Sequence, residues 1–450
     1  MDARINYLYK NRKNRVRTHQ APEVGHGSFP LKLLAHERRI AWLMTAVQFV
    51  SVISFMVVMP LGPDFAPALG IDPARVGWVL AAYTGASAIS GLLAAMVLDR
   101  FDRRPAIGIA MVGLLLCNLA AAFSVDLWSL LAARALAGLF GGPAGALSVA
   151  IVADNVPPER RGKAVGMVMG ALSISSVLGI PAALELSHLF GWRVPFLVVA
   201  GMGLAIITAV LFIMPPQRAH LTGAPVRLAD APLRLLRIGT GTLPWLAFAL
   251  AFVSIVPGFM LITNLAIFAQ YNLGFPREHL GLLYMVGGVV SFFGMRATGA
   301  LVDRKGSAPV TLVTALALGG LIFLIYYDWF WLSLPLLLLV PCFMLFNTAR
   351  MVAQSTAVSK VPAPADRAGF MALVQSVTQV AGGAAALTAS ALLETAPDGR
   401  LLHMDRVALL ALCINFLGAP LIWALERRLP KGAEPSHRVR AAAVKGAPPG

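Results

Sequence analysis

Long apolar stretches separated by short polar breaks occupy most of this 450-residue chain. A helix needs about 20 mostly apolar residues to cross the hydrocarbon core of a bilayer, and twelve stretches reach or approach that length. The pattern therefore predicts an all-α membrane protein. We expect transmembrane helices at residues 40–60, 75–98, 106–124, 127–152, 163–186, 194–214, 243–270, 279–302, 308–327, 331–357, 367–391 and 405–425.

Two related halves are predicted from the breaks between these helices. The longest hydrophilic break follows the sixth helix and leaves six helices on either side. Asp99-Arg100 and Asp303-Arg304 are 204 residues apart, and Val156-Pro157 and Val361-Pro362 are 205 residues apart. A shared period at two landmarks indicates duplication of a six-helix unit, an organisation found in many secondary transporters.

The chain is accordingly divided into two pseudo-symmetric bundles with polar segments around them. The basic run within the first segment is predicted either to contact anionic lipid headgroups or simply to be solvated. The predicted parts are a disordered cytoplasmic tail at 1–38, a first bundle at 39–214, a cytoplasmic loop at 215–242, a second bundle at 243–426 and a cytoplasmic tail at 427–450.

Composition agrees with a membrane location. Hydrophobic residues make up 58% of the chain and charged residues 13%, against about 25% charged in soluble domains. The net charge of +16 follows from topology: 29 Lys and Arg residues fall in the segments on one side and only five in the loops on the other. Because basic residues collect on the cytoplasmic side, both termini are predicted to be cytoplasmic, and nucleic-acid binding is not needed to explain the charge.

The short loop after the second predicted helix reads Asp99-Arg-Phe-Asp-Arg-Arg-Pro105. Asp99 and Arg103 are four residues apart at a helix end, so they can pair, and the carboxylate can also meet the positive N-terminus of another helix. We consider two interpretations. The loop is either a latch between the cytoplasmic ends of the halves or a charge cluster that only sets topology.

This loop resembles the Gly-x-x-x-Asp-Arg-x-Gly-Arg-Arg motif of the major facilitator superfamily, with Ala95 and Asp102 at the glycine positions. The second copy keeps both glycines, as Gly299 and Gly306. Over residues 38–428 the chain resembles the twelve-helix proton-linked drug and metabolite exporters, which include sugar- and purine-efflux proteins. The resemblance implies a monomeric antiporter in the bacterial cytoplasmic (inner) membrane, with a conformational gate at Asp99, Arg100, Arg103, Asp154, Asp303 and Arg304.

Arg134 lies in the apolar run Leu130-Leu-Ala-Ala-Arg134 and is a functional candidate, because an arginine inside a membrane span is costly. The resemblance implies a role in proton coupling. The structural alternative is a set of hydrogen bonds to carbonyls across the bundle. Arg296 and Arg350 are nearer the cytoplasmic ends of their helices, so we expect them to extend to the interface.

The fifth predicted helix carries Gly170, Gly179 and Pro181, in a run that partly resembles the antiporter motif Gly-x-x-x-Gly-Pro-x-x-Gly-Gly. Small residues let helices approach closely, and proline allows a bend. These residues are predicted to support packing between helices that rock. Ordinary helix packing is the alternative.

A solute cavity needs a few polar groups among apolar walls. Gln48 and Asn264 rank first because they occupy the first helix of each half, the helices that line the cavity in the family that the chain resembles. No acidic residue occurs between Ile40 and Pro60, so the candidates for a proton site are Asp64 and Glu185, and a solvated loop carboxylate is the alternative for Asp64. The predicted solute-binding or coupling residues are Gln48, Arg134, Asn264, Gln270, Gln375 and Gln379.

Other functional classes lack their motifs here. The sequence contains no Gly-x-x-x-x-Gly-Lys-Ser/Thr loop, no His-Glu-x-x-His and no Cys/His cluster, so we predict no enzyme, no cofactor and no metal site. The predicted partners are a small-molecule substrate, protons and membrane lipids. The alternatives to an exporter are an importer or facilitator of the same fold, and a sensor or scaffold that does not transport.

Overall fold

A computed structural model describes residues 33–97, 100–217, 230–327, 335–363 and 366–429. Residues 1–32 of the predicted tail at 1–38, residues 430–450 of the predicted tail at 427–450 and residues 218–229 of the predicted loop at 215–242 lie outside the described residues. The first half consists of α2 (Ala35–Met56), α3 (Gly62–Ala68), the short helix η1 (Pro73–Arg75), α4 (Val76–Val97), α5 (Arg103–Ala122), α6 (Leu127–Asn155), α7 (Pro158–Ile174), the π-helical turn η3 (Ser175–Gly179), α8 (Ile180–Phe190) and α9 (Val194–Ile213).

The second half repeats this helical organisation and adds a small hairpin. Its two strands, each two residues long, are antiparallel, with Glu394 opposite Leu402. The elements are α10 (Asp230–Gly239), α11 (Thr242–Ile262), α12 (Leu265–Ile267), the π-helical turn η5 (Phe268–Asn272), η6 (Arg277–His279), α13 (Leu280–Lys305), α14 (Ser307–Tyr326), α15 (Leu336–Val358), α16 (Arg367–Leu392), β1 (Glu394–Thr395), β2 (Leu401–Leu402) and α17 (Met404–Arg428).

The twelve predicted spans are confirmed, since twelve described helical segments are long and apolar enough to cross a membrane. Their ends differ from the predicted ones. The fifth span covers Glu159–Phe190 rather than 163–186, and the tenth begins at Leu336 rather than at 331. Hydropathy detects the part of a helix that lies in hydrocarbon, whereas the fifth helix begins before it and includes Arg160 and Arg161.

Polar residues begin several of these helices. The Asp126 carboxylate accepts a hydrogen bond from the Ser129 amide at 2.8 Å and caps α6, and Asp102 accepts from the Arg104 amide at 3.0 Å and caps α5. Hydrogen bonds from Ser129 keep the pKa of the Asp126 carboxyl below its usual value. Short polar caps therefore define helix starts that the apolar runs only approximate.

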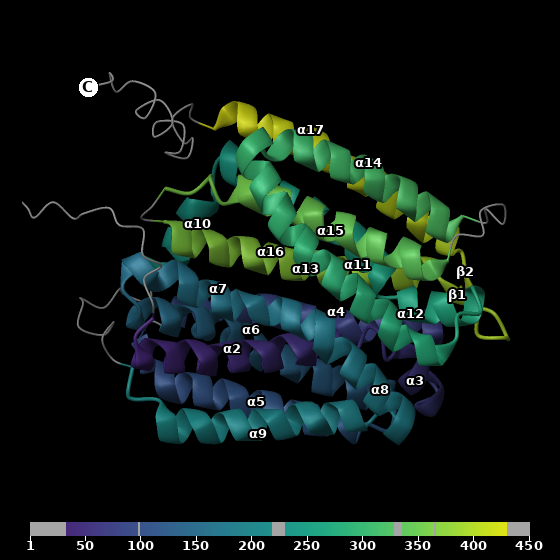
Figure 1. Ribbon diagram of the computed structural model, residues 1–450, viewed down its shortest axis with the longest axis horizontal. Helices are drawn as coiled ribbons and strands as arrows, with labels where there is room; N and C mark the ends of the chain where they lie inside the picture. The colour runs from purple at the N-terminus through teal and green to yellow at the C-terminus, as the bar shows by residue number, and fades with distance from the viewer. Residues whose placement is uncertain (1–32, 98–99, 218–229, 328–334, 364–365, 430–450) are drawn as a thin grey trace, which may run out of the picture.

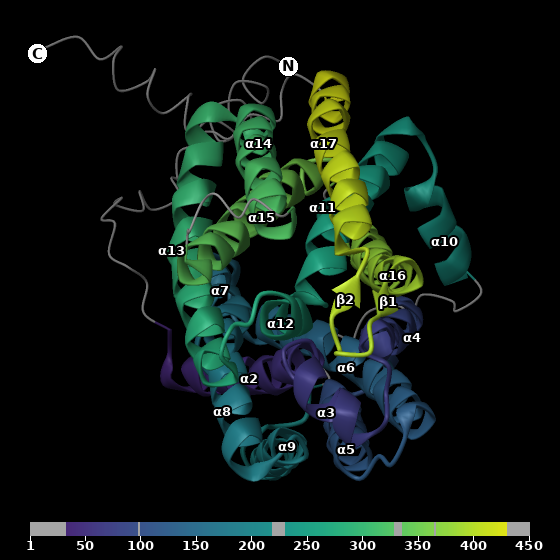
Figure 2. The same cartoon turned by 90° about the vertical axis from the view of Figure 1, so that its right-hand side faces the viewer.

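The helices form two bundles that lie side by side. In Figure 1 the helices from α2 to α9 occupy the lower layer and those from α11 to α17 the upper one, and Figure 2 shows the same two groups from the end that carries α3 and the hairpin. α2 begins and α17 ends on the opposite side, which the charge distribution assigns to the cytoplasm. We call the end with α3 and the hairpin the outer end.

The first long helix of each half is interrupted before it reaches the outer end. α2 ends at Met56 and the chain continues into α3, whereas α11 contains Pro257, ends at Ile262 and continues into α12 and η5. Broken helices leave carbonyl groups without helical donors, so other parts of the protein must supply donors in a bilayer. The residues that do so are part of the candidate site.

Candidate functional site

Arg134 is buried in the first bundle, with 1% of its surface exposed. Its Nη2 donates a hydrogen bond to the Ser54 carbonyl at 2.5 Å, in the last turn of α2, and its guanidinium lies 5.0 Å from the centre of the Tyr83 ring. The hydrogen bond to a carbonyl of another helix is thus present. A role in proton coupling stays a prediction.

Aromatic rings connect this arginine to the second bundle. Tyr83 of α4 packs against Phe55 with ring centres 5.2 Å apart, and Phe55 stacks on Phe259 of α11 at 6.2 Å. Phe55 belongs to the first bundle and Phe259 to the second. The row of rings therefore runs from Arg134 across the interface between the bundles.

Two of the predicted glutamines make hydrogen bonds, one within the first bundle and one between the bundles. Ser148 of α6 donates to Gln48 Oε1 at 2.8 Å, within the first bundle. Gln379 Nε2 of α16 donates to the Ser87 hydroxyl of α4 at 2.8 Å and so joins the two bundles. Gln375, one turn earlier on α16, is exposed.

Asn264 lies at the interruption between α11 and α12 and is fully buried. Its Nδ2 donates to the Met260 carbonyl at 3.2 Å, while Oδ1 has no hydrogen-bond partner among the described residues. Gln270, in η5, likewise has a buried Nε2 without a partner in the described part of the chain. Buried polar atoms of this kind are available to a ligand or to water.

Asp64 is part of a polar cluster at the outer end that joins the bundles. Arg277 of η6 donates from Nε to Asp64 Oδ1 at 2.7 Å and also pairs with Oδ2 through Nη2. The Ser187 hydroxyl of α8 donates to Oδ2 at 2.6 Å, and Arg277 donates to the Leu184 carbonyl at 3.1 Å. About a fifth of each charged side chain is exposed, at 18% and 21%.

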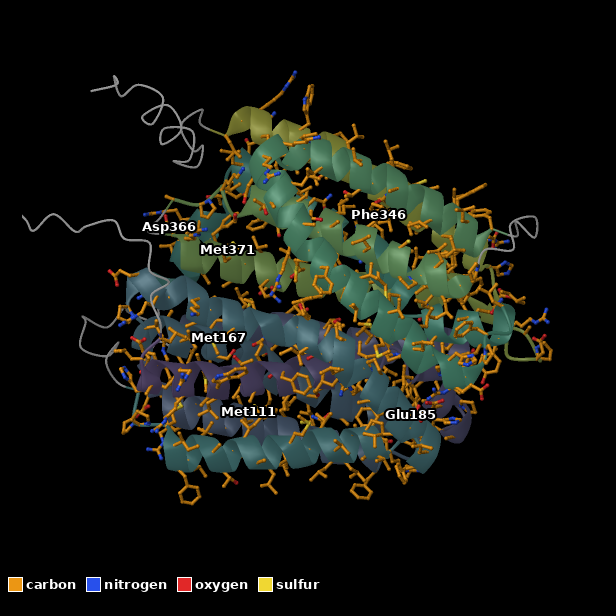
Figure 3. All side chains as sticks on the ribbon, viewed as in Figure 1. Met111, Met167, Glu185, Phe346, Asp366 and Met371 are labelled. Atoms are coloured by element: carbon orange, nitrogen blue, oxygen red, sulfur yellow. The ribbon has the colours of Figure 1, made fainter. Side chains whose placement is uncertain are left out.

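The expectation of a solvated loop carboxylate at Asp64 is therefore wrong. The sequence reasoning also missed Arg277, which it counted only among the five basic residues of the outer loops. The indication of Arg277 in the sequence is weak, because this residue lies 213 positions from Asp64 and no motif links the two residues. Glu185, the other proton-site candidate, is exposed on α8 (Figure 3).

A second contact joins the bundles at the outer end. The Thr395 hydroxyl of β1 donates to Asp72 Oδ1, and the Ala74 amide donates to the Thr395 hydroxyl oxygen at 3.2 Å. Asp72 caps η1 and Ala74 lies within it, just before α4 of the first bundle, whereas Thr395 belongs to the second. The outer ends of the two bundles are thus held together at two places.

At the cytoplasmic end, two of the predicted gate residues, Arg103 and Asp154, form an ion pair. Arg103 is buried, and its Nη1 lies 3.0 Å from Asp154 Oδ2 at the end of α6. This ion pair lies within the first bundle, so the gate stays a prediction. Asp99 lies outside the described residues, Arg100 precedes α5, and Asp303 and Arg304 are exposed at the end of α13.

The structure separates the roles of the small residues in the fifth span. A Cβ at Gly179 would lie 2.7 Å from Cδ1 of Ile53, so this glycine allows close approach of the fifth span to α2. A Cβ at Gly170 would meet no atom within 4 Å, so packing does not require glycine there. Pro181 follows the π-helical turn η3, where the helix changes its hydrogen-bonding pattern.

The expectation that Arg350 extends to the interface is wrong. Arg350 is fully buried in the second bundle and donates from Nη2 to the Ser254 carbonyl at 2.9 Å. Arg296 is exposed, with its guanidinium 4.2 Å from the centre of the Phe292 ring. Position along the helix does not distinguish these two arginines, because the difference depends on which face of each helix meets a neighbour.

Two six-helix bundles in a membrane, with polar and charged side chains at the interface between them, define a secondary transporter of solutes. A family model described as Major Facilitator Superfamily matches residues 44–442. The chain belongs to this family, and its fold is the twelve-helix fold predicted from the sequence. Membership in a family of transporters agrees with the prediction that the protein is not an enzyme.

Curated relatives include efflux and transport proteins of enteric bacteria. The purine ribonucleoside efflux pump NepI of Shigella sonnei is 28% identical over 59% of this chain and 67% of its own length. The inner membrane transport protein YdhP of Escherichia coli K12 is 28% identical over 35% of this chain, and the match spans 40% of that protein. These relatives agree with a multi-pass protein of the bacterial inner membrane.

Solved structures share the fold. A D-xylose–proton symporter superposes with a TM-score of 0.69 at 17% identity, covering 88% of this chain and 98% of that one. A mutant form of the nucleoside transporter NupG superposes with a TM-score of 0.66 at 15% identity, covering 87% and 99%. At these identities the likeness concerns the fold alone.

Proposed function

We propose that the protein exports a small solute by alternating access, driven by proton influx. The observation that carries this proposal is the Asp64–Arg277 ion pair, which joins the bundles at the outer end through a carboxylate that can bind a proton. Protonation of Asp64 from outside removes its charge and weakens the pair, so the outer ends can separate and release solute. For net influx, the outer ends close around the protonated carboxyl, the proton leaves Asp64 toward the cytoplasmic side, and the pair with Arg277 then re-forms.

The solute is expected to be small and rich in hydrogen-bonding groups. The candidate residues at the interface are amides rather than carboxylates, and buried atoms of Asn264 and Gln270 lack partners among the described residues. Such groups suit neutral hydroxylated or heterocyclic solutes better than strongly cationic ones. The similarity to a purine ribonucleoside efflux pump supports testing nucleosides first, followed by sugars and hydrophobic drugs.

The test is solute-dependent pH change inside proteoliposomes that contain the purified protein. Wild-type protein is expected to couple solute flux to proton movement, whereas Asp64→Asn retains flux down a solute gradient but loses proton movement. Glu185→Gln is the matched control, because that carboxylate is exposed on α8. Proton movement that persists in Asp64→Asn contradicts the assignment of the carboxylate, solute flux without protons in the wild type indicates a facilitator, and no flux with any solute favours a scaffold.

A further inference from the structure

Two buried arginines lie on the equivalent fourth and tenth spans, α6 and α15, at different distances from the ends of those helices. Arg134 of α6 donates to the Ser54 carbonyl, and Arg350 of α15 donates to the Ser254 carbonyl. Ser54 and Ser254 both lie on the first long helix of their half and are 200 residues apart, close to the period of the sequence repeat. The motif reasoning identified only Arg134, and the second arginine is recognised only from its contacts.

α11 needs an external donor where Arg350 meets it. Pro257 lies inside α11 and has no amide hydrogen, so the carbonyl of Val253, four residues earlier, loses its helical donor. Arg350 Nη1 donates to this carbonyl at 3.4 Å, and Nη2 donates to the next one, of Ser254, at 2.9 Å. The guanidinium thus takes the place of the hydrogen bond that the proline removes.

The same need exists in the first bundle for a different reason. α2 ends at Met56, so the Ser54 carbonyl belongs to the last turn, whose carbonyls have no donors within the helix. Arg134 supplies that donor at 2.5 Å. A helix end in one half and a proline in the other therefore create similar orphan carbonyls, and an arginine satisfies each.

The surroundings of Arg350 indicate a positioning role. The side chain has 0% exposure, and its described hydrogen-bond acceptors are neutral oxygens: two carbonyls and Asn347 Oδ1, at 3.2 Å from Nη2. Asn347 in turn packs on Gly258, where a Cβ would lie only 2.6 Å from Asn347 Oδ1. The guanidinium fork and the glycine together hold α15 against the proline-containing turn of α11.

The proline-containing turn of α11 matters for transport because Phe259 and Asn264 follow it. Phe259 stacks on Phe55 of the other bundle, and Asn264 stands at the interruption that follows. A change in the backbone at Pro257 moves both residues, because each lies within about two turns of it. We propose that Arg350 is a positioning residue that maintains the proline-containing turn of α11, and so the placement of Phe259 and Asn264 at the interface. The inference rests on the proposed transport function.

The test is a double-mutant cycle between Arg350→Gln and Pro257→Ala. Arg350→Gln is expected to lower the maximal rate of solute flux about tenfold, as the loss of a buried charged hydrogen bond implies. Pro257→Ala returns an amide donor to the Val253 carbonyl. If Arg350 acts by replacing that donor, the double variant should recover at least half of the rate lost in Arg350→Gln.

Controls separate this role from simple loss of charge. Arg296→Gln removes an exposed arginine from the same bundle and is expected to leave flux unchanged within about twofold. Arg350→Lys keeps the charge but lacks the forked guanidinium that reaches two carbonyls. Its rate of solute flux should therefore be lower than that of the double variant. The proposal would be overturned if Arg350→Gln and the double variant lost the same fraction of the flux rate, or if Arg350→Lys kept the wild-type rate.

A second measurement does not depend on transport. Spin labels on cysteines at Ala68 and Asp398, which are exposed at the outer ends of different bundles, report the distance between those ends once the native cysteines are replaced. Arg350→Gln should broaden the distance distribution toward longer values, and Pro257→Ala in the same chain should narrow it again. An unchanged distribution contradicts the inference even if the wild type transports a solute. A changed distance distribution supports the inference even if no solute is found.

If Arg350→Gln does not accumulate in the membrane, the amount of protein in the membrane becomes the measurement. Recovery of that amount by Pro257→Ala supports the proposal, and failure to recover counts against it.

Discussion

At the residue scale, the buried charges of this protein are matched in two different ways. Arg103 pairs with Asp154, and Glu37, which is 1% exposed, pairs with Arg160 at 2.8 Å near the cytoplasmic end. Arg134 instead meets a carbonyl and the Tyr83 ring. A guanidinium held by neutral groups keeps its charge without a fixed counter-ion.

We expect Arg134→Lys to lower coupled flux about tenfold, because an ammonium cannot lie flat against the ring and reach the Ser54 carbonyl at once. Tyr83→Phe keeps the ring and should change flux less than about threefold. Solute flux and proton movement in proteoliposomes, at equal protein content, provide the measurement. Wild-type coupling in Arg134→Lys would show that charge alone is sufficient.

At the scale of the elements, glycines set how closely the helices pack. A Cβ at Gly138 of α6 would lie 2.1 Å from the Tyr83 carbonyl oxygen of α4, so only glycine permits this crossing. At Gly179 the fifth span instead contacts the end of the Ile53 side chain of α2, which can move more easily than a backbone. The chain has 41 glycines, but the position of neighbouring helices determines which of them close packing requires.

Gly138→Ala is expected to destabilise the protein by roughly 1–3 kcal/mol, because the new methyl group must push α4 and α6 apart. Gly170→Ala is the matched control, since open space surrounds that position and alanine favours a helix by about 0.5–1 kcal/mol. Thermal unfolding in detergent should therefore move in opposite directions for the two variants. A parallel shift would disprove the packing argument.

At the scale of the whole molecule, the two bundles are held together at the outer end. Asp64–Arg277 and Asp72–Thr395 connect α3 and the start of α4 to η6 and the hairpin. Both links are formed by side chains from loops and short elements, so they can break while each bundle stays intact. This is the property that a rocking motion between bundles requires.

Arg277→Gln should therefore shift the protein toward a state with the outer end open. A cysteine at Gly281, which faces the Pro181 carbonyl across the bundle interface, provides the reporter. We expect faster labelling of this cysteine by a membrane-impermeant maleimide in Arg277→Gln than in the unmodified background. Arg406→Gln, at an exposed arginine of α17, serves as control and should not change the rate. Equal rates in all three chains would mean that the ion pair does not hold the outer end closed.

The sequence by itself determined the twelve helices, the two halves and the predicted cytoplasmic side. A bilayer forces each spanning helix to satisfy its own backbone and to be apolar over a known length, so these features are local and readable. It also indicated Arg103 and Asp154, through a motif. Only the tertiary structure decided that Asp64 meets Arg277, that Arg350 is buried while Arg296 is not, and that Gly179 lies against Ile53 of α2 while Gly170 faces open space. Those outcomes depend on which face of a helix meets a helix far away in the chain, and hydropathy contains no information on that.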